Sequence, residues 1–153
     1  MAATTLPPEI TFRIRRFDPA VDAAPHWADF SLPYSVGMTV LDGLKLIKES
    51  RSASLAWRSS CRMGVCGSCG MFINGRPRLA CNTQIAELGT SLVTVAPLPN
   101  FHIIRDLVPD LSPMFDAHVA LMPYIIRDDL AEAEEPSGEF WQSIEDMEHY
   151  LQF

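Results

Sequence analysis

The N-terminal part of the chain alternates between apolar and polar positions, which is the pattern of half-buried β-strands. Residues 10–17 and 28–34 each place an apolar side chain at nearly every second position, so each predicts a strand with one face to bury. The loop between them contains Pro19 and Pro25, and we expect the two strands to form a hairpin. Pro33 cannot donate a ladder hydrogen bond, which places the second strand at a sheet edge or near its own end.

A helix is predicted next, with Thr39 as its N-cap and Asp42 at the third helical position, a variant of the capping box. Apolar residues then recur at helical spacing, at Val40, Leu41, Leu44 and Ile47. Gly43 interrupts this pattern and costs the helix about 1 kcal/mol relative to Ala.

Two further patterns complete the predicted first domain. Residues 71–79 read as a short hairpin that turns at Asn74-Gly75, because both turn positions accept positive φ. Residues 91–95 predict one more strand, closed off by prolines. Two strands, a helix and returning strands indicate an α+β domain that covers residues 1–105.

The pattern changes after residue 105. Apolar residues recur at four-residue spacing, but Pro109 and Pro113 limit any helices to short ones. Residues 128–138 read as an acidic linker, and a capped helix with one apolar side is predicted from Ser143. We expect residues 106–153 to be a helical extension, the start of an incomplete second domain, with Arg105 and Asp106 anchoring the first domain to it.

Composition and charge narrow the class of protein. The 153 residues, 48% apolar and 20% charged, suffice for one domain with an appendage. The net charge of −7 hides an asymmetry, because residues 1–105 carry 11 basic and 7 acidic side chains while residues 106–153 carry 1 and 12. An acidic tail on a mildly basic body argues against nucleic acid as a partner. No apolar run reaches the length of a membrane helix, and the first residues lack the pattern of a secretory or import signal.

The four cysteines carry the clearest chemical signal. Cys61, Cys66 and Cys69 follow a C-x4-C-x2-C pattern, and Cys81 supplies a fourth thiol after the predicted hairpin. This is the plant-type spacing of a [2Fe–2S] cluster, whose two irons need four thiolates. Three glycines in the loop permit close approach and positive φ, at Gly64, Gly67 and Gly70. The nearby Arg58 and Arg62 would offset the negative charge of such a cluster.

Other chemistries fit this pattern less well. A structural zinc site usually has paired C-x2-C knuckles rather than three cysteines and one, and two disulfides do not suit an intracellular context. The histidines share no ligand spacing with one another or with the cysteines, at positions 26, 102, 118 and 149. No nucleophile, base or paired-carboxylate set stands out, so no catalytic residue is predicted.

The segment from Ser60 to Cys81 closely resembles the iron–sulfur subunit of succinate dehydrogenase and fumarate reductase. The resemblance extends from Val95 through Val108, with His102 where that family usually has Pro. It implies a β-grasp ferredoxin-like fold, with Cys61, Cys66, Cys69 and Cys81 as the [2Fe–2S] ligands. It also implies a non-catalytic relay that accepts electrons from an FAD-containing flavoprotein subunit.

In that family the electrons continue to a [4Fe–4S] and a [3Fe–4S] cluster in a second domain, and then to quinone at membrane anchor subunits. The cysteine runs of that domain are absent here, so those clusters and FAD are expected on partner or missing segments. We therefore expect a fragment or split half of the subunit, peripheral to the cytoplasmic face of a bacterial or archaeal membrane. The alternatives are a stand-alone [2Fe–2S] ferredoxin that serves another flavoprotein and, from a different class, an interaction module in which the four cysteines hold zinc.

Overall fold

The alternating strands at the N-terminus form one side of a five-stranded sheet. The computed structural model describes residues 6–123 and 144–150. In it β1 (Glu9–Arg16) pairs antiparallel with β2 (His26–Pro33) and parallel with β5 (Leu92–Ala96). β3 (Gly70–Ile73) and β4 (Arg76–Leu79) form the second hairpin, and the strand order is β2-β1-β5-β3-β4. β2 is an edge strand, as Pro33 predicted.

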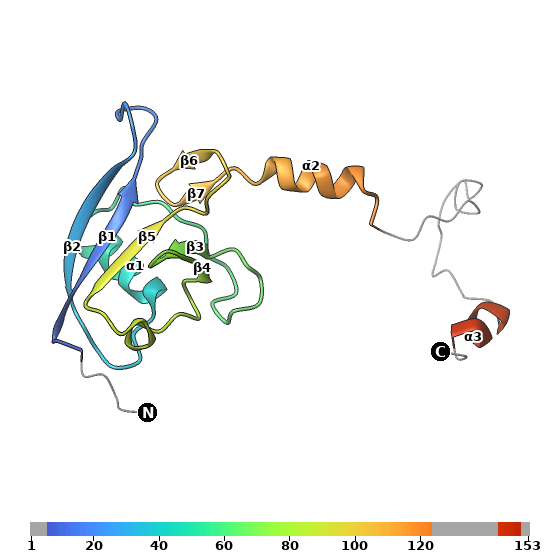
Figure 1. Ribbon diagram of the computed structural model, residues 1–153, viewed down its shortest axis with the longest axis horizontal. Coiled ribbons are helices and arrows are strands. Elements are labelled where there is room, and N and C mark those ends of the chain that lie inside the picture. The colour runs from blue at the N-terminus through green and yellow to red at the C-terminus, as the bar shows by residue number, and fades with distance from the viewer. Residues whose placement is uncertain (1–5, 124–143, 151–153) are drawn as a thin grey trace. The chain divides into compact units, whose positions relative to one another are not determined.

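Helix α1 (Val40–Ser50) covers one face of this sheet (Figure 1). Its capping box is present as predicted, because Thr39 Oγ1 accepts from the backbone N–H of Asp42 while the Asp42 carboxylate accepts from the backbone N–H of Thr39. The side chains at the predicted apolar positions are buried. They meet the inward-facing residues of the strands, of which Phe12, Ile14 and Val95 are fully buried.

Packing explains why a glycine stands at position 43 inside the helix, which the sequence pattern does not show. The ring of Phe12 lies so close to this glycine that an added Cβ would overlap with it. The helix therefore approaches β1 closely at this point. Only glycine leaves room for the ring, although a glycine inside a helix is less favourable than an alanine.

A hairpin, a covering helix and a later strand parallel to the first make an α+β fold of the β-grasp type, which confirms the predicted fold class. The turn between β3 and β4 falls at Asn74 and Gly75, with φ of 45° and 76°. A 3₁₀ turn, η1 (Ile85–Leu88), leads to β5.

Residues 103–109 form a small second sheet that the sequence pattern did not predict, with β6 (Ile103–Arg105) antiparallel to β7 (Val108–Pro109). The connection between these strands is buried, at Asp106 and Leu107. By its contacts the chain divides into one unit of residues 1–115 and another of residues 116–153. The first unit thus includes the 106–109 segment, and the division into domains at residue 105 stays a prediction.

Two helices follow these strands. α2 (Ser112–Ala120) has every side chain exposed among the described residues, including Phe115 at 57% and Val119 at 67%. α3 (Ile144–Tyr150) occupies the predicted C-terminal helix, while its expected cap at Ser143 and the acidic linker at 128–138 lie outside the described residues. No helix in the described part of the chain is both long and apolar enough to cross a membrane.

Candidate functional site

Three of the four cysteines lie where the chain between α1 and β3 has no regular secondary structure. Residues 59–69 form a loop that ends at β3, and Cys81 follows β4 closely. We call residues 59–69 the cysteine loop. The β3–β4 hairpin brings Cys81 back to this loop, as predicted, and the backbone N–H of Ala80 donates to the carbonyl of Cys69 at 3.0 Å.

The four thiols come together in two pairs. The Sγ atoms of Cys69 and Cys81 lie 3.2 Å apart. Cys61 and Cys66 face each other through reciprocal contacts, in which the N–H of Cys66 donates to Cys61 Sγ at 3.3 Å and the N–H of Cys61 donates to Cys66 Sγ at 3.5 Å. All four are free of disulfide bonds. In a [2Fe–2S] cluster with four cysteine ligands each iron takes two thiolates, so the four cysteines of such a site must form two pairs.

The two pairs differ in their surroundings. Cys69 is buried and Cys66 is exposed, with Cys61 and Cys81 between these extremes. Burial raises the pKa of the Cys69 thiol. The hydrogen bond with the Ser68 hydroxyl, followed by that from the Cys61 N–H, lowers the pKa of Cys66 from 9.0 to about 6. Cys66 is therefore ready to bind metal as thiolate at neutral pH, whereas metal must displace a proton from Cys69.

The glycines in the loop and directly after it have separate roles. Gly64 and Gly67 both have φ of 76°, in the left-handed region that glycine adopts without strain. A Cβ on Gly64 would lie 3.3 Å from the side chain of Asn82, so this glycine lets the loop approach the segment that carries Cys81. A Cβ on Gly70 would lie 3.2 Å from the carbonyl oxygen of Gly67, which is already bonded to the N–H of Gly70 at 2.9 Å.

The buried half of the site is tied to the core. The carbonyl of Ala80 accepts from the N–H of Leu41, and the carbonyl of Thr83 accepts from that of Val40, both in the first turn of α1. Thr83 is itself buried and donates its hydroxyl to the carbonyl of Leu79 at 2.9 Å. Cys81 thus lies in a segment fixed against the helix on one side and against Cys69 on the other.

The two arginines predicted to offset the charge of a cluster, Arg58 and Arg62, make different contacts. The Nη1 of Arg58 donates to the carbonyl of Pro109 at 2.8 Å. Arg62 is exposed, has φ of 58°, and helps to hold the pKa of Asp42 below its usual value, although the hydrogen bonds from Thr39 are the main cause. Among residues 6–123 and 144–150, no three side chains of His, Cys, Asp or Glu converge as ligands for a single metal ion.

Sequence reasoning missed two polar neighbours of the cysteines and did not predict the partners of Arg105 and Asp106. Ser68 and Asn82 carry no signal of their own beyond their place beside Cys69 and Cys81. Arg105 pairs with Asp18, just after β1, at 2.7 Å, and Asp106 pairs with Arg16, the last residue of β1, at 2.8 Å, while their predicted role as anchors to the following segment stays a prediction.

The donor set fits a [2Fe–2S] cluster, with four thiols in two pairs, glycines at the points of closest approach and backbone N–H groups directed at sulfur. Similar proteins agree with this assignment. The chain is 38% identical over 144 residues to the fumarate reductase iron–sulfur subunit of Mycobacterium tuberculosis, covering 94% of this chain and 58% of that protein. It is 40% identical over 139 residues to the succinate dehydrogenase iron–sulfur subunit of Coxiella burnetii, covering 90% of this chain and 57% of that one.

A solved structure, that of the Mycobacterium smegmatis Sdh1 complex in the apo form, contains a chain that superposes with a TM-score of 0.72 at 30% identity. The match covers 94% of this chain and 57% of that chain. The chain thus spans a little over half the length of these relatives. The family model for the 2Fe-2S iron-sulfur cluster binding domain matches residues 11–116. The resemblance found in the sequence is confirmed, and this chain belongs to the family of 2Fe-2S iron-sulfur cluster binding domains.

Proposed function

We propose that Cys61, Cys66, Cys69 and Cys81 are the ligands of the [2Fe–2S] cluster and that this chain relays single electrons. The observation that carries the proposal is the pairing of the thiols, with Cys69 and Cys81 in contact at 3.2 Å and Cys61 and Cys66 linked by reciprocal N–H contacts. One iron would take the exposed pair and the other iron the buried pair. The cluster supplies one-electron chemistry, and the protein tunes the potential through hydrogen bonds and burial.

The chain's own groups do the tuning. The N–H groups of Cys61 and Cys66 point at sulfur and would stabilise negative charge there, as would the hydroxyl of Ser68, which lies 3.3 Å from Cys66 Sγ. Gly64 and Gly70 let the chain come close without a side chain in the way, and Gly67 adopts a φ of 76° without strain. Burial of Cys69 keeps water from one side of the site.

The proposal for the larger function is supported by the relatives, which are subunits of fumarate reductase and succinate dehydrogenase. We infer that this chain is a non-catalytic relay subunit of such an oxidoreductase. Its partners would be an FAD-containing flavoprotein and, indirectly, membrane anchor subunits, with the complex at the cytoplasmic face of the membrane. Substrate chemistry then belongs to the flavin.

The surface of the cysteine loop suits a protein partner. Met63 and Val65 stand between the ligand positions and are 73% and 79% exposed. Apolar side chains at the rim of a redox site allow a partner to exclude water and to bring its own redox group near. The flavoprotein is therefore expected to dock on the cysteine loop.

The test of the ligand assignment is to replace each cysteine by serine in turn and to measure iron, labile sulfide and the absorption of the oxidised cluster. Each of the four variants is expected to lose the cluster or to hold it with an altered spectrum. The control variant is Ser59→Ala, because Ser59 lies in the same loop but is not one of the four cysteine positions. This variant is expected to keep the native spectrum. A cysteine variant with native iron, sulfide and spectrum would remove that cysteine from the set.

The relay role is tested by co-expression with the FAD-containing subunit. Co-purification of the two chains, and reduction of the cluster by succinate through the flavin, are expected. If the chain instead stays separate and accepts electrons from another flavoprotein, it is a stand-alone ferredoxin.

A further inference from the structure

The exposed pair of cysteines has little to hold it in place within its own loop. Among the described residues, the hydrogen bonds of residues 59–68 are those between Cys61 and Cys66, that between Cys66 and Ser68, and the bond from Gly70 to Gly67. The segment that carries Cys81, by contrast, is bonded to α1 through the carbonyls of Ala80 and Thr83, and the carbonyl of Cys69 accepts from the N–H of Ala80. The position of Cys61 and Cys66 must therefore be set where the chain enters the loop.

The chain enters through residues 55–58, and the segment 106–109 holds this entry by three bonds. The N–H of Ala56 donates to Asp106 Oδ2 at 2.9 Å, the N–H of Leu107 donates to the carbonyl of Ala56 at 3.2 Å, and Nη1 of Arg58 donates to the carbonyl of Pro109 at 2.8 Å. We call residues 106–109 the strap. Ala56 is thus bonded through both its N–H and its carbonyl, a short distance along the chain before Cys61.

Asp106 is the centre of the strap. Its side chain is 1% exposed, and its other oxygen accepts from Arg16 Nε at 2.8 Å and from the N–H of Phe17 at 3.0 Å. Its own N–H donates to the carbonyl of Phe17 at 2.7 Å. The residue has φ of 47°, a region in which Asp is tolerated better than most residues. One carboxylate therefore joins the end of β1 to the entry of the cysteine loop.

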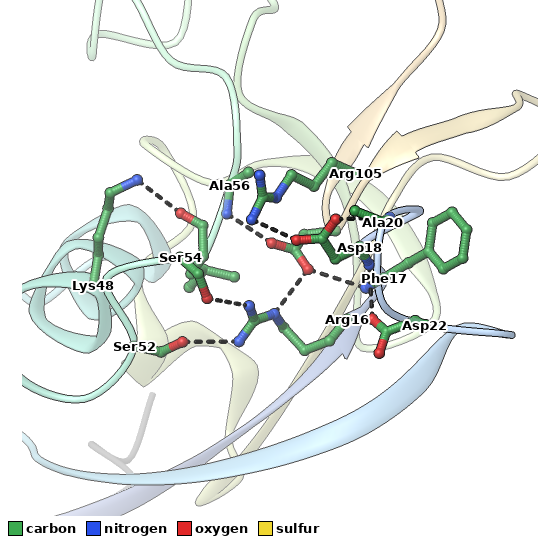
Figure 2. Close-up of polar contacts among 12 residues, drawn as sticks. Arg16, Phe17, Asp18, Ala20, Asp22, Lys48, Ser52, Ser54, Ala56 and Arg105 are labelled. Atoms are coloured by element: carbon green, nitrogen blue, oxygen red, sulfur yellow. Dashed lines mark hydrogen bonds and ion pairs between the residues drawn. The ribbon is translucent and has the colours of Figure 1, made fainter.

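Arg16 also binds the residues that lie between α1 and the entry to the loop. Figure 2 shows its guanidinium directed at the hydroxyls of Ser52 and Ser54, which it reaches at 2.9 Å and 3.0 Å. Lys48 of α1 adds a bond from Nζ to the carbonyl of Leu55 at 2.8 Å and lies over the ring of Trp57. These contacts fix where the chain leaves α1, while the strap fixes Ala56 and Arg58.

We propose that Asp106 is a positioning residue for the cluster: through the strap it holds the Cys61 and Cys66 half of the site in register with the Cys69 and Cys81 half. This inference rests on the proposed function of the four cysteines.

The test compares variants of the full chain in two readouts. The first is the rate at which the anaerobic, cluster-loaded protein loses iron to a chelator. The second is hydrogen exchange of the amides of residues 61–66 in cluster-free protein, which needs no cluster. For Asp106→Asn, in which an amide N–H replaces one acceptor oxygen, both rates are expected to rise about tenfold, the factor for one lost hydrogen bond to a charged group.

Two controls separate positioning from general stability. Ser54→Ala removes a contact of Arg16 but leaves all three strap bonds, and Asp29→Asn breaks the ion pair with Arg13 on the sheet, where both side chains are nearly half exposed. Both are expected to leave the two rates unchanged. Should Asp106→Asn fail to fold, Arg58→Gln tests the strap at an exposed residue, and both rates are expected to rise in it too.

The outcomes are distinct. The inference is overturned if the folded strap variants match the controls, or if the amides of β3 and β4 exchange faster by the same factor as those of the loop. If the wild-type protein holds no iron or sulfide, the proposed function fails, and the exchange of cluster-free protein still decides whether the strap orders the loop.

Discussion

The guanidinium of Arg16 and the carboxylate of Asp106 meet at 2.8 Å across 90 positions of sequence, with side chains that are 14% and 1% exposed. The pair joins the last residue of β1 to the connection between β6 and β7. Both partners have further hydrogen bonds, which is the condition under which a buried ion pair offsets its desolvation. Figure 2 shows the hydroxyls of Ser52 and Ser54 beside the guanidinium of Arg16.

Removing one partner of this pair is expected to destabilise the domain strongly. Arg16→Gln leaves the Asp106 carboxylate buried with only its backbone donors, and loss of one partner of a buried pair typically costs about 3–5 kcal/mol. Urea unfolding of the cluster-free protein measures the change. The matched variant Arg13→Gln breaks the exposed pair with Asp29 and is expected to change stability little. Equal losses in the two variants would contradict the role assigned to Asp106.

Gly43→Ala is expected to lower the stability of the fold, whereas replacing glycine by alanine inside a helix usually raises it. Alanine normally stabilises a helix relative to glycine by about 1 kcal/mol, but here its Cβ would overlap with the Phe12 ring. Overpacking of this kind costs about 1–3 kcal/mol. Thermal or urea unfolding gives the sign directly.

The smaller side chain in Phe12→Leu should partly remove that penalty. The double variant is therefore expected to lose less stability than the sum of the two single variants. Additive losses would show that the ring and the helix backbone are not in contact at this point.

The capping box predicts both a stability change and its pH dependence. Thr39→Ala is expected to cost about 1 kcal/mol, the usual value of an N-cap hydroxyl. The hydrogen bonds from Thr39 hold the pKa of Asp42 below its ordinary value of 3.8. The Asp42 carboxylate therefore stabilises the fold above pH 3.8, and this contribution is lost as the pH falls through the lowered pKa.

Asp42→Asn tests that sign. The stability difference between this variant and the wild type is expected to be constant near neutral pH and to shrink in acid, as measured by urea unfolding at several pH values. A difference that grows in acid would mean that the carboxylate does not favour the folded state.

A negative charge introduced on the cysteine loop between the ligand positions is expected to impair docking of the flavoprotein without impairing cluster binding. Met63→Glu and Val65→Glu change side chains that are 73% and 79% exposed, so the cluster content is expected to stay native. Reduction of the cluster by the flavoprotein should slow, because a carboxylate is desolvated on docking. Val36→Glu, at a position 95% exposed in the connection between β2 and α1, is the control. Equal rates for all three variants would place the docking surface elsewhere.

Local rules predicted much of this fold. The alternation of β1 and β2, the Thr39 capping box, the Asn74-Gly75 turn and the edge position signalled by Pro33 are all present. Each depends on residues close together in sequence. The cysteine spacing likewise predicted a loop and a returning fourth thiol, because a short hairpin returns the chain close to where it began.

Long-range relationships could not be predicted in the same way. The parallel pairing of β1 with β5 and the contact of Phe12 with Gly43 depend on the whole sheet. β6 and β7 have three and two residues, too few for a periodic pattern. The sequence marked Asp106 only as an anchor to the segment that follows, and its partners at Arg16, Phe17 and Ala56 reveal its role.

The most direct test of the cluster assignment is metal analysis of the full chain prepared without oxygen, combined with its electron paramagnetic resonance spectrum after reduction with dithionite. We expect about two irons and two labile sulfides per chain and a spectrum from one unpaired electron, as for a cysteine-ligated [2Fe–2S] cluster. One zinc ion per chain, with neither iron nor sulfide and no such spectrum after reduction, would contradict it.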